Sequence, residues 1–164
     1  MIERIPNRKY GAAIAHALGF IPDRIMHRLA GVRIFAGSDP IFAGLHGFEN
    51  ISDGRSYRHT AHCCYPWHFD RPRADRVTTI VLPCERATRP AVVVHEMGHA
   101  LHHAVDLDYE AVPVSDYGAT NHREAFAEAF AAWVLPLGHG YGAAKDRLYA
   151  MDRETVALLD GLAA

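Results

Sequence analysis

The chain has 164 residues, of which 49% are hydrophobic and 22% charged, and its formal net charge is −2. This length can bury the core of one domain, so we expect a single domain over residues 1–164. Lys and Arg are spread along the chain, which does not indicate a nucleic-acid-binding protein. No apolar run approaches the roughly 20 residues of a membrane-spanning helix, so we expect no membrane partner.

The cysteines and the N-terminal residues bear on the cellular compartment. The chain has three cysteines, Cys63, Cys64 and Cys84, and an odd number with an adjacent pair is a poor framework for disulfides. The mildly apolar patch near the N-terminus contains His16 and runs into Pro22, which is not typical of a signal peptide. We therefore expect a cytoplasmic location, and the sequence leaves the oligomeric state open.

In chain order, the pattern of apolar residues, glycines and prolines predicts two short helices, a small twisted sheet and then mostly helices. Helices are predicted over residues 9–19 and 22–30, from Thr88 or Pro90 through the histidines that follow, over 121–134, and over 153–162 with Asp152 as the cap. Strands are predicted over 32–37 and 76–83, with turns and a short strand in 38–54 and an extended segment in 55–69. A loop over 105–120 and a turn at Gly138, Gly140 and Gly142 join the later helices. This order predicts an α+β fold.

The segment VVVHEMGHALHH, residues 92–103, contains an HExxH motif. His95 and His99 are four residues apart, so on a helix they share one face and their ring nitrogens can converge on one zinc ion. Glu96 projects beside them, where its carboxylate can take a proton from a zinc-bound water as a general base. The apolar run before the motif would bury these groups, and burial without partners is costly, which favours a metal site over an ordinary amphipathic helix.

His102 and His103 follow the motif but do not fit as ligands of the same ion. His102 lies seven residues after His95, which is about 10 Å farther along a straight helix. The extended motif HExxHxxGxxH has a glycine at the position of His102 and a histidine at the position of Val105, so it is absent. We expect both histidines to be solvent-exposed or to support the site without binding the ion.

The third ligand must come from elsewhere, since a catalytic zinc ion normally has three protein ligands and one open position. The segment SDYGATNHREAFAEAF, residues 115–130, offers Glu124 and Glu128, which share a helix face. The alanines around them, together with Gly98 on the first helix, allow two helices to approach closely. Both glutamates could alternatively lie on the surface. The other face of this helix is apolar: Phe126, Phe130, Trp133 and Val134.

HEMGHAL followed by SDYGATNHREAFAEAF resembles the catalytic domain of the anthrax lethal factor family of zinc metallopeptidases, over residues 91–131. The resemblance implies a small zincin-like catalytic domain, in which one helix carries HExxH and a second helix carries the third ligand. It implies that one zinc ion is bound by His95, His99 and Glu124. It also implies that Glu96 is the catalytic base.

Two further roles and an activity follow from the resemblance. Tyr117 would donate a hydrogen bond to the developing oxyanion, and Glu128 would orient a ligand histidine, although Glu128 could instead be a structural ion-pair partner. The implied activity is that of an endopeptidase acting on a protein or peptide substrate. Two alternatives stay open: a zinc-binding regulatory module without turnover, and a zinc hydrolase of non-peptide amides. The sequence does not identify the substrate.

A second group of potential metal ligands lies in the extended segment and after it: His59, His62, Cys63, Cys64 and His68, with Cys84 farther along. Their spacing fits no closed structural zinc pattern, so a second metal site is an alternative and not our expectation. One of the cysteines could also serve as the third ligand in place of Glu124, as in peptide deformylases. The aromatic residues Tyr65, Trp67 and Phe69 could line a substrate cleft, although core positions are the more common ones for such residues.

Overall fold

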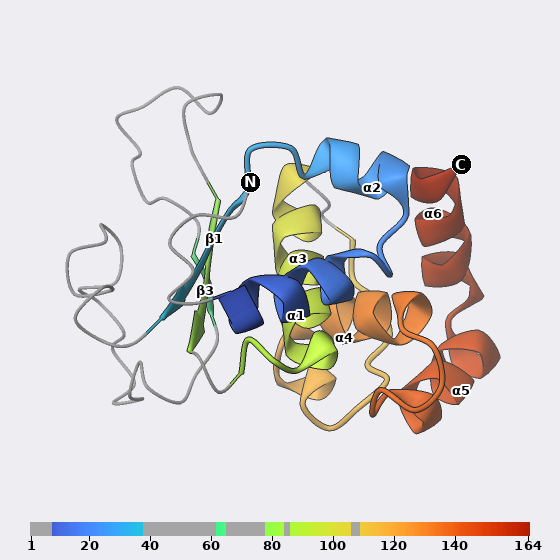
Figure 1. Cartoon of the computed structure of the whole chain (residues 1–164). Helices are drawn as coiled ribbons and strands as arrows, with labels where there is room; N and C mark the ends of the chain where they lie inside the picture. Colours follow the sequence, from blue (N-terminus) through green and yellow to red (C-terminus); the bar gives the residue numbers. More distant parts are fainter. Residues whose placement is uncertain (1–7, 38–61, 65–77, 84–85, 106–108) are drawn as a thin grey trace.

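The computed structural model of the chain describes residues 8–37, 62–64, 78–83, 86–105 and 109–164. The helices gather on one side of a small sheet (Figure 1). Helix α3 (Pro90–Ala104) contacts the sheet as well as helices α1 (Arg8–Leu18), α2 (Asp23–Arg28) and α4 (His122–Val134). The helix that carries the histidines is therefore the central element of the fold.

The sheet has three described strands, in the order β1 (Arg33–Gly37), β3 (Thr79–Pro83) and β2 (His62–Cys64). β1 runs parallel to β3, with Arg33 opposite Thr79, whereas β2 runs antiparallel to β3, with Cys63 opposite Ile80. β3 lies in the middle, and its residues 80–82 are almost completely buried. A continuous apolar run is typical of a strand that is covered on both faces.

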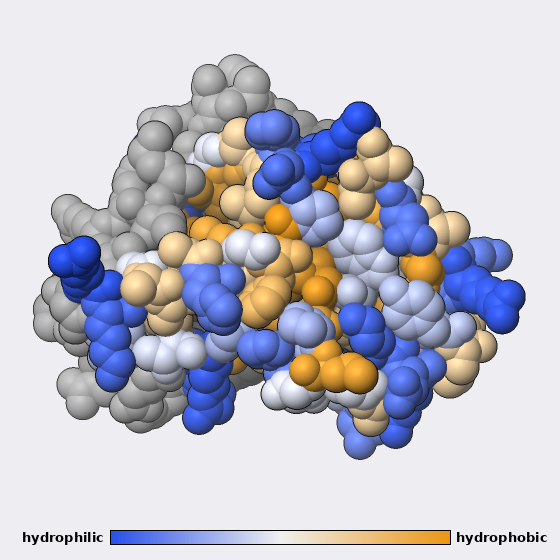
Figure 2. Space-filling model, turned by 45° about the vertical axis from the view of Figure 1, so that its right-hand side comes forward, coloured by the Kyte–Doolittle hydropathy of each residue, from blue (hydrophilic) through white to orange (hydrophobic). Residues whose placement is uncertain are grey.

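The core lies between α3 and its neighbours. Met97 and Leu101 of α3 are buried together with Phe126 and Phe130 of α4, so the side of α4 predicted to be apolar does face the core. Trp133, near the C-terminal end of α4, is only partly buried. On the face of the molecule seen in Figure 2, apolar side chains stay visible between hydrophilic ones, as expected where partly buried residues pack against the core.

The C-terminal part of the chain adds helices α5 (Gly142–Met151) and α6 (Arg153–Ala163), and a 3-10 helix, η3 (Gly118–Thr120), precedes α4. Asp152 caps α6 as predicted, because its Oδ1 accepts a hydrogen bond of 3.0 Å from the backbone N–H of Thr155. Its Oδ2 accepts a second one, of 2.8 Å, from the N–H of Val112. The connection between α3 and α4 is thereby tied to the C-terminal helices. Within the described ranges, no helix is long and apolar enough to cross a membrane.

The predicted plan of two helices, a small sheet and then mostly helices is confirmed for the described residues, so the fold class is α+β, although two further helical elements are present. The boundaries move by a few residues. α2 ends at Arg28 rather than at residue 30, because the chain turns there into Gly31, whose φ is 98°. α3 begins at Pro90 with Arg89, not Thr88, as its N-cap, since proline fits the first helical position.

Helix α5 is the element that the sequence pattern does not predict. Leu148 is the one residue of α5 that is fully buried, so the helix lacks a broad apolar face that would reveal it. Gly138 and Gly140 form the predicted turn, with φ values of 100° and 90°, whereas Gly142 already belongs to α5. Similarly, η3 interrupts the predicted loop 105–120. Outside the described residues lie the predictions for 38–54 and for most of 55–69.

Candidate metal centre

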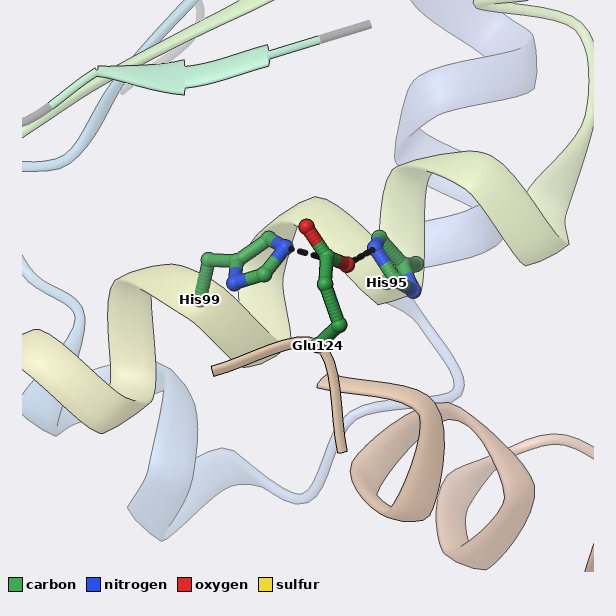
Figure 3. A group of neighbouring side chains, drawn as sticks. All are labelled: His95, His99 and Glu124. Carbon is green, nitrogen blue, oxygen red and sulfur yellow. Dashed lines mark ion pairs between the residues drawn. The ribbon is translucent and has the colours of Figure 1, made fainter. Parts of the chain in front are cut away.

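Helix α3 presents His95 and His99 on one face, one helical turn apart. Both side chains are buried, and their ring centroids are 4.8 Å apart with the ring planes at 86°. In Figure 3 the two rings stand on the same side of the helix, and the carboxylate of Glu124 lies between them. The spacing of the motif therefore produces the convergence that was predicted for the two histidines.

The first turn of α4 supplies Glu124. Asn121 is the N-cap, and its Oδ1 accepts hydrogen bonds from the backbone N–H groups of Arg123 (3.1 Å) and Glu124 (3.0 Å). This cap fixes where the helix begins and hence which residue of the first turn faces α3. Gly98 lets the two helices meet, since a Cβ at Gly98 would lie 2.9 Å from the Cα of Ala127. The close approach predicted from the small residues is confirmed.

Three ligand atoms converge at this point. Glu124 Oε2 lies 3.1 Å from His95 Nε2 and 3.2 Å from His99 Nε2 (Figure 3). Two ligands about 2.05 Å from a tetrahedral ion are about 3.3 Å apart, so these two separations match those around a zinc-sized cation. Within the described part of the chain, His95, His99 and Glu124 are the group of His, Cys, Asp or Glu residues that could hold a metal ion.

The polar atoms of this group fit a cation. Among the described residues, Glu124 Oε2 is buried without a hydrogen-bond partner of good geometry. A buried carboxylate oxygen without a donor is unfavourable, and a neutral histidine that donates from Nδ1 presents only a lone pair at Nε2. Three electron-rich atoms then face one another at short range. A positive charge between them would remove this repulsion.

A proton can occupy this place when no metal is bound. Burial opposes the protonation of His95, but the adjacent carboxylates of Glu124 and Glu128, together with the charge of Glu96, raise its pKa to about 10. Burial also acts to raise the pKa of Glu124, yet its contacts with His95 and His99 lower it well below the ordinary value. The surroundings therefore favour an ionised glutamate and a positive charge beside it.

Glu128 lies behind His95, one helical turn after Glu124. Its Oε1 is 3.0 Å from His95 Nδ1 and accepts a hydrogen bond of 2.5 Å from the hydroxyl of Tyr141. Its Oε2 accepts a hydrogen bond of 2.7 Å from Ser115 Oγ. Burial would raise the pKa of Glu128, but these three partners lower it, so the side chain is an ionised acceptor.

Glu96 and Tyr117 border the same group. Glu96 is buried on α3 directly after His95. Tyr117 precedes η3, its ring centroid is 5.9 Å from that of His95, and 49% of the residue is exposed. Of these two residues, Glu96 is therefore shielded from solvent, whereas Tyr117 is half-exposed.

Within the described residues, His102 and His103 are not part of the group that could hold a metal ion, as the helical spacing predicts. His102 is nevertheless buried rather than solvent-exposed, because its ring lies 5.0 Å from that of Phe126 and it hydrogen-bonds the backbone of Tyr109. Burial, the larger effect, lowers its pKa. His103 is partly buried.

Sequence reasoning missed two residues near the site, Ser115 and Tyr141. Ser115 lies inside the segment 115–130 that the motif singled out, but nothing in its position indicates a contact with Glu128. Tyr141 lies among glycines, in no recognisable motif. The alternative of a second metal site is not tested, because the following residues or their side chains lie outside the described part: His59, His62, Cys63, Cys64, His68 and Cys84.

Comparisons with known proteins add no assignment to this geometry. No protein-family model matches the chain, and neither a curated protein nor a solved structure matches it.

Proposed function

We propose that the chain is a zinc-dependent endopeptidase with a small zincin-like catalytic domain, as its resemblance to the anthrax lethal factor family implies. The observation that carries this proposal is the convergence of three ligand atoms, from His95, His99 and Glu124, beside the buried carboxylate of Glu96. A metal-binding triad without an adjacent base would favour a structural site. A metal-binding triad together with an adjacent base favours a hydrolytic site.

The donor set supports zinc over other common ions. Two imidazole nitrogens and one carboxylate oxygen suit zinc, whereas calcium and magnesium are bound mainly by oxygen ligands. Three protein ligands also match the catalytic type of zinc site, which keeps one position for water or substrate. A zinc ion held here would supply a Lewis acid that polarises a peptide carbonyl and makes water more acidic.

Glu96 is the proposed proton carrier. Its carboxylate lies on the turn of α3 that holds the ligand His95, so it is positioned by the same helix. In the proposed reaction it accepts a proton from the attacking water and then delivers that proton to the leaving amine. A buried base next to the reacting groups keeps the proton from being lost to solvent.

Tyr117 is the proposed donor to the oxyanion. The residue is half-exposed and its ring lies beside that of His95, which supports a place at the edge of the site where a substrate could reach it. The backbone carbonyl of Tyr117 accepts hydrogen bonds from the Thr120 hydroxyl (2.7 Å) and the Thr120 N–H (3.1 Å), which hold the turn in place. A donor fixed in advance stabilises charge that develops during the reaction.

The sheet offers a place for the substrate backbone. Among the described strands β3 is central, so β1 and β2 form the edges, and β2 also contacts α3. An extended peptide that paired with the β2 edge would lie beside the histidine helix. We therefore propose strand addition at β2 as the mode of substrate binding.

A cleavage assay tests the proposed function. Zinc-loaded chain is incubated with a peptide library, in parallel with Glu96→Gln and with Glu154→Gln as a control for loss of a glutamate charge on the exposed part of α6. We expect cleavage by the unmodified chain and the control, and none by Glu96→Gln, although it retains zinc. Zinc binding without any cleavage would instead indicate a regulatory module, and chelator-sensitive hydrolysis of amides alone would indicate the non-peptide hydrolase.

A further inference from the structure

We propose that Tyr141 and Ser115 are positioning residues of the metal centre, which hold the carboxylate of Glu128 so that it orients His95. This inference deepens the proposed function and rests on its metal-binding part, not on the reaction. The residues come from three separate places in the chain: Ser115 from the connection before α4, Glu128 from α4 itself, and Tyr141 from the residue that precedes α5.

Each oxygen of Glu128 has its own hydroxyl donor. Tyr141 donates to Oε1 at 2.5 Å, and Ser115 donates to Oε2 at 2.7 Å. Burial, followed by the charge of Glu128, raises the pKa of Tyr141, so the phenol stays protonated and remains a donor. With both oxygens bound, the carboxylate cannot rotate about its terminal bond without losing a hydrogen bond in a buried setting.

The consequence falls on His95. Its Nδ1 lies 3.0 Å from Oε1, the same oxygen that accepts from Tyr141. A ring that donates from Nδ1 to a fixed carboxylate has its tautomer and orientation set, and Nε2 is the atom left for a metal ion. In this arrangement Nε2 lies 3.1 Å from Glu124 Oε2. The two hydroxyl groups thus act on the metal centre through Glu128.

The sequence after α4 explains how Tyr141 reaches this position. Gly138 and Gly140, both with positive φ, turn the chain back at the end of α4. Lys145, one helical turn after Tyr141, donates from Nζ to the backbone carbonyls of Trp133 (3.2 Å) and Leu135 (2.8 Å). Because these carbonyls lie at the C-terminal end of α4, the start of α5 is fastened to the helix that carries Glu128.

Ser115 also contacts the turn that carries Tyr117. Its Oγ accepts a hydrogen bond of 2.9 Å from the backbone N–H of Gly118, while its proton is directed to Glu128. Tyr117 lies between these two residues in the turn. One serine hydroxyl therefore fixes both the support of His95 and the turn that carries the proposed oxyanion donor, so its loss should affect more than metal binding.

Zinc affinity, measured by competition with a chelator, tests the proposal. We expect Tyr141→Phe and Ser115→Ala each to weaken zinc binding by about 10- to 100-fold, the usual effect of removing a group that supports a metal ligand. Tyr149→Phe removes a phenol hydroxyl from an exposed position on α5, the helix that Tyr141 precedes, and should leave the zinc affinity unchanged. The absorption spectrum of the cobalt-substituted chain at saturating metal should shift in Tyr141→Phe and Ser115→Ala but not in Tyr149→Phe, since a general loss of stability would not alter the ligand geometry of the folded protein.

Unchanged zinc affinity together with an unchanged cobalt spectrum in Tyr141→Phe would overturn the positioning role of Tyr141. If Tyr141→Phe does not fold, unchanged affinity and spectrum in Ser115→Ala would overturn the proposal instead. The proposed function fails separately. If these variants lose affinity while the unmodified chain cleaves no peptide, the positioning role stands and the endopeptidase does not. If the unmodified chain cleaves peptides while both variants bind zinc normally, the endopeptidase stands and the positioning role does not.

Discussion

Replacing Gly98 by alanine is expected to force α3 and α4 apart. The new Cβ would lie 2.9 Å from the Cα of Ala127 and 3.2 Å from its carbonyl oxygen. Carbon atoms in contact are ordinarily about 3.5–4.0 Å apart, so the helices must separate locally by about 0.6 Å or more. Overpacking costs about 1–3 kcal/mol, and the better helix propensity of alanine returns about 1 kcal/mol. The difference is about 0–2 kcal/mol, and since the obstacle is backbone rather than a flexible side chain, we expect the upper half of that range, about 1–2 kcal/mol.

Thermal and urea unfolding of the metal-free chain measure this effect. A loss of this size lowers the midpoint by roughly 2–8 °C for a chain of this length. Gly161→Ala is the matched control, because Gly161 lies in α6 and a Cβ added there would meet nothing within 4 Å beyond its own stretch of helix, so we expect equal or slightly higher stability. Zinc affinity should fall in Gly98→Ala but not in Gly161→Ala, since the candidate ligands lie on α3 and α4, which Gly98→Ala separates. Stability equal to that of Gly161→Ala would refute the packing argument.

Three further predictions follow from the site and its supports. Zinc affinity should rise by about tenfold per pH unit from pH 6.5 toward 10, because a proton on His95, whose pKa is about 10, competes with zinc throughout this window. The same proton stabilises the metal-free chain fully below pH 6.5, and this stabilisation is lost as the pH rises through the folded pKa. A flat profile of affinity against pH in chelator competition would contradict this. Asn121→Ala should cost about 1 kcal/mol in urea unfolding and also weaken zinc binding, because it removes the cap of the turn that holds Glu124. Asp152→Ala should cost about 1–3 kcal/mol, since it leaves the buried end of α6 and the N–H of Val112 without their acceptor, yet change zinc affinity little; equal effects of these two variants on zinc binding would argue against separate roles.

The candidate ligand group could be predicted from the sequence in two steps: the HExxH spacing indicates His95 and His99, and the resemblance to the lethal factor family, not spacing alone, selects Glu124. The spacing of His95 and His99 is fixed by the helical repeat, and Asn121 sets the start of the helix that carries Glu124 three residues later. Only the packing of the two helices is non-local, and the alanines and Gly98 indicate it. The helical repeat likewise excludes His102 from the ligand group.

The supports of the site could not be predicted because they depend on contacts between distant segments. Tyr141 reaches Glu128 only through the turn after α4, and the short α5 has too little buried surface to show a clear pattern. The burial of His102 has the same origin, since Phe126 and the backbone of Tyr109 cover it from other elements. The spacing of apolar residues shows which face of a helix is buried, but not which distant segment packs against it.

The zinc content of the purified chain after equilibration with zinc, measured by mass spectrometry beside Glu124→Ala, tests the central claim most directly. The geometry of His95, His99 and Glu124 predicts one zinc ion per unmodified chain and a marked loss of bound zinc in the variant. An unmodified chain that binds no zinc, or a variant that holds it as tightly, would contradict the metal centre on which the proposed function rests.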